Sequence, residues 1–205
     1  MIRIIGAENR EALAPELQSM HRHRKQVFVD FLKWDVPVID GQYEIDQFDN
    51  DDAVYLLVSD PQTRAHLGSV RLLPTQRPHL MSEIFPFLCD GGPPNSEEVW
   101  EITRLCTAPK VADPPTVRRH LCTALMEYGL LHGIRRYVSV THMAFLSQVL
   151  AVGWNCEPLG LPQTVNGEEI GAIAIDVSAE SLSYFRKSLG LKRPLIGLSD
   201  EAQAA

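Results

Sequence analysis

The sequence predicts an α/β sandwich in which helices cover both faces of a mixed sheet. The expected elements run strand, helix, several adjacent strands, and then helices and strands in alternation. The chain has 205 residues, of which 45% are hydrophobic and 22% are charged, enough for one globular domain that covers a pocket. We expect one domain over residues 1–198, a disordered tail over 199–205, and neither an internal repeat nor a low-complexity segment.

The first elements are a short strand at residues 2–5 and a long helix over residues 10–32. The apolar stripe of this helix is predicted to contain Leu13, Leu17, Met20, Val27 or Phe28, and Phe31. Arg24 lies four residues before Phe28, so it shares that face and stands where a core residue is expected. Taken alone, Arg24 is interpreted as a side chain whose stem snorkels outward to solvent.

Residues 33–52 lack any periodicity and contain Pro37 and Gly41, so they predict a loop long enough to cover a site. From residue 35 the segment holds seven carboxylates and no Lys or Arg, which favours a cationic ligand. These are Asp35, Asp40, Glu44, Asp46, Asp49, Asp51 and Asp52. The spacing does not fit a calcium loop, whereas a solvated face is the alternative for Asp51 and Asp52.

Charged residues also occur inside predicted strands. Two strands are expected at residues 54–59 and 66–73, and in the second Arg71 lies among apolar neighbours. Residues 99–106 have the apolar density of a buried central strand but contain Glu101 and Arg104. Because an interior charge is costly unless it is paired, this strand holds either an internal ion pair or a site.

The C-terminal half predicts alternating helices and strands. A helical turn is expected near residues 82–87, and Pro114-Pro115 begins a helix that Gly133 ends. The later elements are a strand at 137–141, a helix at 144–152, a strand at 171–177 and a helix at 179–189.

Composition excludes several classes of protein. The net charge of −7 argues against a nucleic-acid binder, which needs clustered Lys and Arg. No apolar run approaches the ~20 residues of a membrane span, and the N-terminus lacks a secretory signal, so a cytoplasmic protein is expected. The cysteines show no C-x-x-C pair, so we expect neither a metal site nor disulfides, and thiols that are reduced and mostly buried. They are Cys89, Cys106, Cys122 and Cys156.

The charged and aromatic residues of the first half resemble a known family. In identity and spacing, they are similar to the signature set of the acyl-homoserine-lactone synthases. The matching residues are Arg24, Phe28, Trp34, the E-x-D-x-x-D pattern of Glu44, Asp46 and Asp49, then Arg71, Glu101 and Arg104. One departure is Thr103-Arg104-Leu105, where Ser-Arg-Phe is more usual, and it puts the acyl preference in doubt.

The resemblance implies a fold and a reaction. The fold is GNAT-like, a three-layer α-β-α sandwich with a mixed, mostly antiparallel central sheet, in which the thioester arm enters where two central strands splay apart. The amine of S-adenosylmethionine attacks an acyl thioester, and the carboxylate then displaces methylthioadenosine to close a lactone used in quorum sensing. No cofactor is expected, because S-adenosylmethionine and the acyl thioester are substrates.

The acyl donor implied is an acyl-carrier protein or acyl-CoA. GNAT enzymes bind the coenzyme A pyrophosphate on a Gly-rich turn that leads into a helix. The corresponding residues 107–115 contain no glycine. This disfavours an ordinary acetyltransferase and favours an acyl-carrier protein as the donor.

The resemblance also implies roles for residues. The catalytic candidates are Glu101, as a base that acts directly or through water, Arg104 and Asp46. The set expected to bind S-adenosylmethionine is Arg24, Phe28, Trp34, Asp46, Asp49, Arg71 and Arg104. Two alternatives stay open: Asp46 and Asp49 either hold the cationic groups of the substrate or neutralise Arg24 and Arg71. Phe28 and Trp34 are expected to wall the pocket, although ordinary core residues are the alternative.

Other predicted sites depend on less specific signals. The acyl pocket is predicted to contain Thr103, Val140, Thr141, Met143, Phe145 and Leu146. Thr141 matches a family position linked to 3-oxo acyl chains, and β-propensity is the alternative reason for a threonine there. The basic residues Arg118, Arg119, Arg135 and Arg136 are predicted to dock the carrier, with a solvated basic face as the alternative. His142 is interpreted as structural.

Two other functions compete with lactone synthesis. One is a GNAT-type N-acetyltransferase that uses acetyl-CoA. The other is a non-catalytic sensor that binds S-adenosylmethionine or an acyl group.

Overall fold

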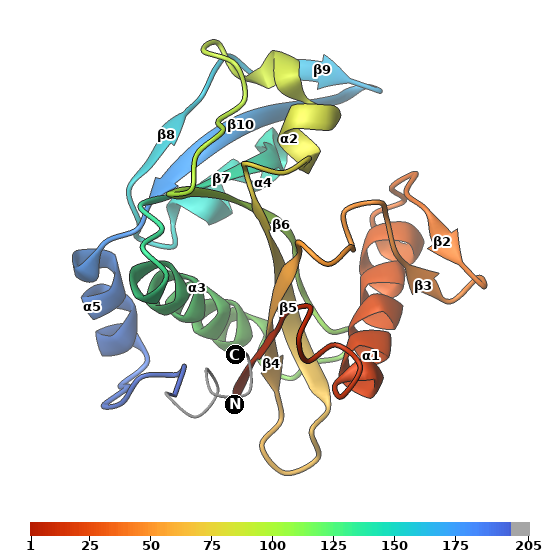
Figure 1. Ribbon diagram of the computed structural model, residues 1–205, viewed down its shortest axis with the longest axis vertical. Coiled ribbons are helices and arrows are strands. Elements are labelled where there is room, and N and C mark those ends of the chain that lie inside the picture. The colour runs from red at the N-terminus through yellow and green to blue at the C-terminus, as the bar shows by residue number, and fades with distance from the viewer. Residues whose placement is uncertain (198–205) are drawn as a thin grey trace. The chain divides into compact units, whose positions relative to one another are not determined.

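A computed structural model describes residues 1–197, which separate into two compact units, and each unit is described by itself (Figure 1). The first unit contains residues 1–72, 104–124 and the segment from 193, and the second contains 73–103 and 125–192. The predicted tail, residues 199–205, lies outside the described residues. The single domain over 1–198 stays a prediction.

The first unit is built on antiparallel strands. Strand β1 (Ile2–Ile5) pairs with β4 (Val54–Ser59), and β4 pairs with β5 (His66–Pro74). Next to β5 in the strand order is β6 (Val99–Thr107), of which residues 104–107 belong to this unit. Alternation along β5 sends Arg71 to one face and the buried Val70 and Leu72 to the other.

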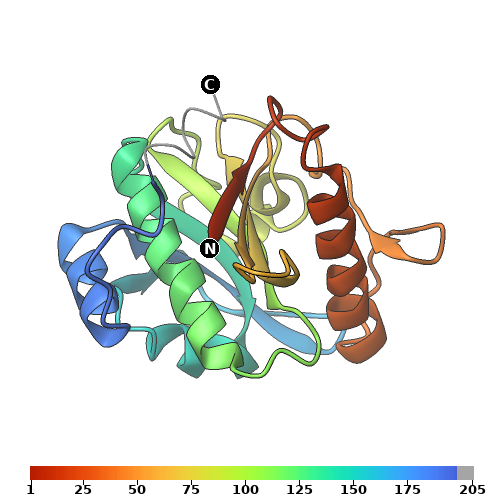
Figure 2. The same cartoon turned by 90° about the horizontal axis from the view of Figure 1, so that it is seen from below.

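Helices cover both faces of these strands, so the first unit has the predicted helix-sheet-helix layering (Figure 2). One layer is the first part of α3 (Pro114–Leu131), which packs so closely that a Cβ on Gly68 would lie 2.6 Å from a Val117 methyl carbon. A glycine is therefore required at position 68. The other layer is α1 (Ala14–Arg24), followed by the π-helical segment η1 (Lys25–Phe31).

The predicted helix over residues 10–32 is wrong in extent and regularity. The α-helix begins at Ala14 and changes to π-helix after Arg24. A π-helix has more residues per turn, so residues three apart no longer share the face that they share in an α-helix. Phe28 is buried, but Phe31 is 79% exposed and does not belong to the apolar stripe.

The predicted loop over residues 33–52 contains a small hairpin that periodicity did not indicate. Strands β2 (Val38–Ile39) and β3 (Tyr43–Glu44) pair antiparallel, with Gly41 in the left-handed region at φ +67°. A hydrogen bond of 2.9 Å between Nδ1 of His21 and the carbonyl oxygen of Glu44 joins this hairpin to α1. The acidic segment is therefore held against the helix that carries Arg24.

The second unit has a mixed sheet. Residues 99–101 of β6 pair in parallel with β7 (Arg136–His142), and β7 pairs antiparallel with β10 (Glu168–Asp176). Two short strands, β8 (Cys156–Pro158) and β9 (Gln163–Val165), add to β10 and were not predicted. The predicted mixed, mostly antiparallel α/β class is confirmed.

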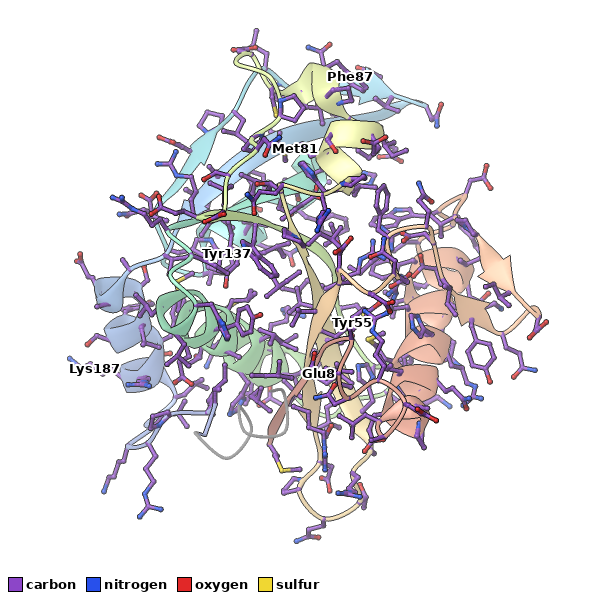
Figure 3. The ribbon with its side chains drawn as sticks, viewed as in Figure 1. Glu8, Tyr55, Met81, Phe87, Tyr137 and Lys187 are labelled. Atoms are coloured by element: carbon purple, nitrogen blue, oxygen red, sulfur yellow. The ribbon has the colours of Figure 1, made fainter. Side chains whose placement is uncertain are left out.

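Helices lie on both faces of the second unit's sheet. On one face α2 (Leu80–Glu83) and the 3-10 turn η2 (Pro86–Leu88) close an apolar cluster that includes Met81 and Val138. On the other face the Tyr137 hydroxyl donates to the Leu125 carbonyl of α3 at 2.8 Å (Figure 3). The remaining helices are α4 (Met143–Leu150) and α5 (Ala179–Ser188). Among residues 1–197, no helix is both long and apolar enough to cross a membrane.

Candidate functional site

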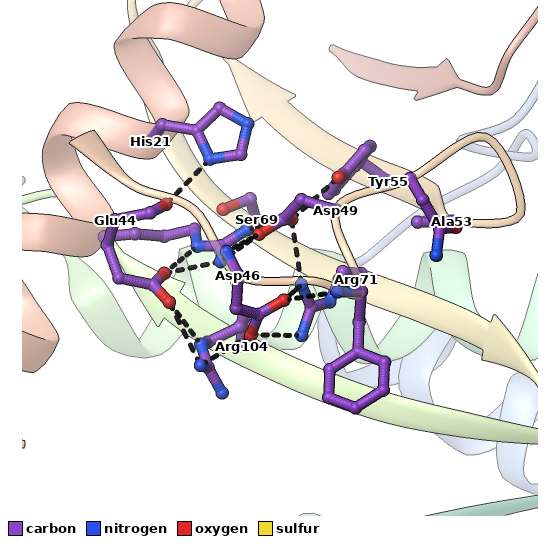
Figure 4. Close-up of polar contacts among 12 residues, drawn as sticks. His21, Glu44, Asp46, Asp49, Ala53, Tyr55, Ser69, Arg71 and Arg104 are labelled. Atoms are coloured by element: carbon purple, nitrogen blue, oxygen red, sulfur yellow. Dashed lines mark hydrogen bonds and ion pairs between the residues drawn. The ribbon is translucent and has the colours of Figure 1, made fainter. Parts of the chain in front are cut away.

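Six charged side chains of the first unit form a continuous buried array, called here the charge network (Figure 4). Its members are Arg24, Arg71, Arg104, Glu44, Asp46 and Asp49. The three positive and three negative charges cancel.

Arg24, at the end of α1, is the centre of the first group of contacts. Its two terminal nitrogens donate to the two Asp49 carboxylate oxygens at 2.7 and 2.9 Å, which is the bidentate geometry of a strong charge-assisted pair. Its Nε donates to Glu44. The Arg24 side chain is 1% exposed, so the outward snorkelling interpretation is wrong. Two carboxylates compensate the desolvated charge, and the stem has no need to reach water.

Arg71, from β5, makes the second group of contacts. It is bidentate to Asp46 at 2.6 and 3.0 Å, and one of its nitrogens lies 2.9 Å from Asp49. The Asp46 backbone N–H donates to Asp49 at 2.9 Å, which fixes the turn between the two aspartates. Asp46 and Asp49 thus neutralise Arg24 and Arg71 in the structure, one of the two alternatives that the sequence left open.

Arg104, from β6, completes the network and is its most accessible member. It donates to Glu44 at 3.0 Å and to Asp46 at 2.8 Å, and its side chain is 7% exposed against 0% for Arg71. Its φ of +54° is in the left-handed region, unusual for a non-glycine residue in a strand and frequent at functional sites.

Two aromatic rings lie beside Arg104. Phe28 and Trp34 stack with their centroids 4.8 Å apart and their planes 13° from parallel. The Arg104 guanidinium carbon is 5.6 Å from the Phe28 centroid and 6.0 Å from the Trp34 centroid, within cation–π range. The residues predicted to bind S-adenosylmethionine are therefore together in the first unit.

The network keeps Arg24 and Asp49 ionised. Burial alone would lower the pKa of Arg24, but the carboxylates of Asp49 and Glu44 outweigh burial and raise it. Burial alone would raise the pKa of Asp49, but Arg24 and Arg71 hold it well below its usual range. Every change that removes one charge therefore leaves an opposite charge buried.

Three supporting residues were missed as site residues in the sequence. Glu44 was noted as one of the acidic residues and as the first residue of the E-x-D-x-x-D pattern, but not as a site residue, yet it pairs with two arginines. The Tyr55 hydroxyl donates to Asp49 at 2.7 Å, and burial together with that carboxylate raises the pKa of Tyr55. Burial and Arg24 lower the pKa of His21, which contacts the Glu44 backbone. Tyr55 on β4 lies directly opposite Arg71 on β5. The pairing of these two predicted strands is the signal that could have identified Tyr55 as a site residue.

Glu101 is a buried carboxylate of the second unit. It is 0% exposed, and its two oxygens accept hydrogen bonds from the backbone N–H groups of Leu80 and Met81 at 2.8 and 2.9 Å. These donors lie at the start of α2, where free N–H groups are available. The arrangement fixes the direction of the carboxylate.

The residues predicted for the acyl pocket divide between two faces of the second unit's sheet. Val140 lies with Glu101 and Val138 on the face that α2 covers, because residues two apart share a face. Thr141, one residue on, points to the opposite face. Thr103 is 5% exposed, Met143 and Leu146 are half-buried, and Phe145 is 40% exposed. Nδ1 of His142 lies 3.7 Å from Glu168.

The basic residues predicted to dock a carrier have different surroundings. Arg118 and Arg119 are exposed on α3. Arg136 instead pairs with Glu157 at 2.8 Å and with Asp176 at 3.1 Å, and Arg135 lies 3.8 Å from Glu98. Because Arg135 and Arg136 are next to three carboxylates, this part of the surface is not positively charged. Asp51 and Asp52 are exposed, as the solvated-face alternative expects.

The prediction that most of the cysteines are buried is confirmed. All are free, and three of the four are buried. Burial raises the pKa of Cys106 to about 11 and of Cys122 to about 12, so both are thiols at neutral pH and poor nucleophiles. Within residues 1–197, no cluster of three His, Cys, Asp or Glu side chains could hold a metal ion.

Known sequences show the family to which this chain belongs. Residues 9–185 match the sequence profile of the family described as autoinducer synthase. An acyl-homoserine-lactone synthase of Ralstonia nicotianae is 32% identical over 170 residues, which are 80% of this chain and 83% of that protein. An isovaleryl-homoserine lactone synthase of Bradyrhizobium diazoefficiens is 30% identical over 192 residues, which are 93% of this chain and 86% of that protein.

Solved structures show the same family and the same fold. A CoA-dependent acyl-homoserine lactone synthase, BjaI, solved with SAM and isopentyl-CoA, superimposes with a TM-score of 0.88 at 30% identity and covers 100% of this chain and 98% of that one. A putative N-acetyltransferase from Lactobacillus plantarum, at 16% identity and a TM-score of 0.58, shares the fold alone. The predicted GNAT-like fold is thus confirmed, and the chain belongs to the autoinducer synthase family of acyl-homoserine-lactone synthases.

Proposed function

We propose that this chain joins S-adenosylmethionine to an acyl group and releases an acyl-homoserine lactone with methylthioadenosine. The amine nitrogen forms an amide bond with the acyl carbon, and the thiol leaves with the proton. A carboxylate oxygen then bonds to the γ-carbon, and the sulfonium sulfur takes the electron pair of the broken bond. The observation that carries the proposal is a charge-neutral buried network beside two stacked aromatic rings.

Arg104 and Asp46 are proposed to contact S-adenosylmethionine. The substrate has a carboxylate for Arg104 and a cationic amine for Asp46, so it can replace the contact between these two side chains. Arg104 is the most exposed member of the network, and Asp46 follows at 4%. The aromatic pair Phe28 and Trp34 is proposed to hold the adenosyl and sulfonium groups, because rings attract cations through their faces.

Arg24, Arg71 and Asp49 are proposed to position those two residues. Their side chains are 0–1% exposed, and each is already paired with two or more network members. They hold Asp46 and Glu44 rigidly, and Glu44 and Asp46 in turn orient Arg104. A preformed array needs little reorganisation when the substrate binds.

Glu101 is proposed as the general base for the attacking amine. Acylation requires the neutral amine, and a free α-amino group titrates near ~8, so a base helps to remove its proton. The hydrogen bonds from Leu80 and Met81 hold the Glu101 carboxylate in one direction. A water between Glu101 and the amine is part of this proposal.

The acyl donor is proposed to be acyl-CoA. The support is that BjaI and a second neighbour, MesI, at a TM-score of 0.83 and 32% identity, are both described as CoA-dependent. The N-terminus of α3 does not offer an ordinary phosphate cradle, because the Asp113 carboxylate already accepts from the Thr116 N–H at 3.1 Å. We therefore propose that the exposed Arg118 and Arg119 bind the phosphates.

No cofactor takes part in the proposed reaction. Both steps are substitutions at carbon that move no electrons to or from an acceptor, so two substrates and the side chains named above suffice. Because both substrates are metabolites of the cytoplasm, we propose that the enzyme works there.

The test is turnover by the purified chain. S-adenosylmethionine is supplied with acetyl-CoA, with a series of longer acyl-CoA thioesters, or with the same acyl groups on an acyl-carrier protein. Mass spectrometry then measures acyl-homoserine lactone and methylthioadenosine. We expect both products in equal amounts with longer acyl-CoA thioesters.

Other outcomes would replace the proposal. Transfer of acetyl groups to another amine without methylthioadenosine would indicate an N-acetyltransferase. Binding of S-adenosylmethionine without any turnover would indicate a sensor. Turnover from the acyl-carrier protein alone would overturn the proposed donor and leave the reaction intact.

A further inference from the structure

A second polar pocket of the first unit lies apart from the charge network. It has a volume of about 480 Å³ and is formed by β1, the start of α1 and the turn between β4 and β5 (Figure 1). This volume is within the range of small-molecule sites. None of its lining residues belongs to the charge network or to the pair Phe28 and Trp34, so the proposed function does not use this pocket.

Arg3 lines the pocket from β1. It lies opposite Leu57 on β4, which lies opposite Ser69 on β5, so these three side chains share the sheet face that α1 covers. Its neighbours Ile2 and Ile4 are buried on the other face. The Arg3 Nε is buried and has no hydrogen-bond partner among residues 1–197. Because a guanidinium only donates hydrogen bonds, what Arg3 lacks is an acceptor.

Arg64 lines the same pocket from the turn between β4 and β5. The Asp60 carboxylate accepts from the N–H groups of Gln62 and Thr63 at 2.9 and 2.8 Å, and the Asp60 carbonyl accepts from the Arg64 N–H at 3.0 Å. These contacts fix the backbone of the turn. The Arg64 guanidinium itself makes no hydrogen bond or ion pair in the described part of the chain. A second unpaired cation therefore lines the pocket.

Two side chains of α1 complete the polar lining. Glu16 and Ser19 are three residues apart, so they share one face of the helix, and both are half-buried. Within residues 1–197, neither side chain has a hydrogen-bond or ion-pair partner, although Glu16 lines the same pocket as two arginines. Opposite charges that share a pocket without touching leave room for a ligand group between them.

The chemistry of this lining selects a class of ligand. Two guanidiniums suit a carboxylate, the Glu16 carboxylate suits an ammonium group, and Leu13 and Pro15 form an apolar wall. A simple anion such as phosphate would satisfy the arginines but would be repelled by Glu16. A zwitterion with an apolar side chain satisfies all three parts of the lining.

We propose that this pocket binds a free α-amino acid with an apolar side chain. The ligand carboxylate contacts Arg3 and Arg64, its ammonium group contacts Glu16, and its side chain lies against Leu13 and Pro15. The incoming carboxylate supplies the acceptor that Arg3 lacks. The inference goes beyond the proposed function and does not depend on it.

The experiment is isothermal titration calorimetry of the full chain with L-leucine and three analogues. L-leucinamide lacks the carboxylate, 4-methylpentanoate lacks the amine, and glycine lacks the apolar side chain. We expect each analogue to bind about tenfold or more weakly than L-leucine, the usual loss for a charged hydrogen bond or a buried apolar side chain. Saturating S-adenosylmethionine should leave the Kd for L-leucine unchanged, because the two sites share no residue.

Substitutions assign each part of the ligand to its contact. Arg3→Met, Arg64→Met and Glu16→Gln should each raise the Kd for L-leucine about tenfold or more. Glu16→Gln should not weaken the binding of 4-methylpentanoate, which has no amine to lose its partner. Arg22→Met is the matched control, because Arg22 is an exposed arginine of the same unit outside the pocket.

The outcomes separate this inference from the proposed function. A wild type that does not bind L-leucine at millimolar concentrations overturns the inference. Equal binding of 4-methylpentanoate and inorganic phosphate indicates a general anion site and also overturns it. Loss of leucine binding in Arg104→Lys but not in Arg64→Met places the ligand in the charge network, with the same consequence. Arg64 is exposed, so Arg64→Met decides if Arg3→Met does not fold. A chain that binds L-leucine but makes no lactone overturns the proposed function alone.

Discussion

The charge network of the first unit and the α4 region of the second are built on opposite principles. In the network, six charged side chains are fixed by short bidentate contacts, and none is more than 7% exposed. In α4, six of the eight residues are apolar, and none of them is buried. Rigid polar groups suit a substrate that never changes, and loosely packed apolar groups suit one that varies. This difference fits the proposal that the network binds the invariant substrate, S-adenosylmethionine, and the prediction from the sequence that residues of α4 line the pocket for the variable acyl chain.

The largest effect is expected at Glu101, the buried carboxyl group proposed as the general base. Glu101→Gln should lower kcat by roughly 10²–10⁴-fold, the usual contribution of a general base. The NH₂ group of the glutamine would face a backbone N–H donor, so the midpoint of thermal unfolding should also fall. Both turnover and the thermal midpoint are therefore measured. A folded variant with full activity would remove Glu101 from the mechanism.

Removal of one charge from the network should lower the stability of the protein. Arg71→Met leaves Asp46 and Asp49 buried with too little positive charge, so the free energy of unfolding should fall by about 3–5 kcal/mol. Urea denaturation measures it. Arg22→Met, an exposed arginine of α1, is the control and should change little. An equally small change in Arg71→Met would mean that the network contributes no stability.

Arg104 tests recognition with less damage to the fold. Arg104→Lys keeps the charge but loses the planar geometry that contacts Glu44 and Asp46 together. We expect the Kd for S-adenosylmethionine to rise roughly tenfold to hundredfold, as for the loss of a hydrogen bond to a charged group. Isothermal titration calorimetry checks the value, and an unchanged Kd would place the substrate elsewhere.

The smallest effect concerns pH. Burial, and then the neighbouring His23, lower the pKa of His66 to about 3, and its Nε2 is buried without a hydrogen-bond partner in the described chain. The unfolded chain takes up a proton below pH ~6.5 and the folded chain does not, so stability is lost as pH falls from ~6.5 towards 3. The loss is at most about 1.4 kcal/mol per pH unit for this one proton.

His66→Asn should flatten this dependence, because asparagine does not titrate and can keep the contact with His23. Thermal midpoints between pH 7 and pH 5 measure the effect. His132→Asn, at an exposed histidine, is the control. A variant as acid-sensitive as the wild type would assign the loss to other groups.

The sequence predicted which residues gather at the site, but it did not predict the local geometry that brings them together. The spacing of Arg24, Asp46, Asp49, Arg71 and Arg104 carried the family resemblance, and these residues do come together. The outward position expected for Arg24 was wrong because its partners Glu44 and Asp49 lie 20 and 25 residues away. Helix periodicity reports only on neighbours along the chain.

The sequence pattern also did not predict where the backbone departs from regular helix and strand geometry. The π-helix at Lys25–Phe31 keeps ordinary helical composition, and the left-handed Arg104 lies in an ordinary strand sequence. Short strands such as β8 and β9 have three residues each, too few for alternation to show. Both departures lie beside the site, where local preference yields to tertiary contacts.

The way in which the network is assembled has a consequence for folding. Glu44 and Arg104 are 60 residues apart, and Arg24 is 25 residues from Asp49. An intermediate with only some of these elements docked would bury charges without counterparts, so partial closure is penalised. The network should therefore form in one concerted late step, and its long-range closure should make refolding of this unit slow.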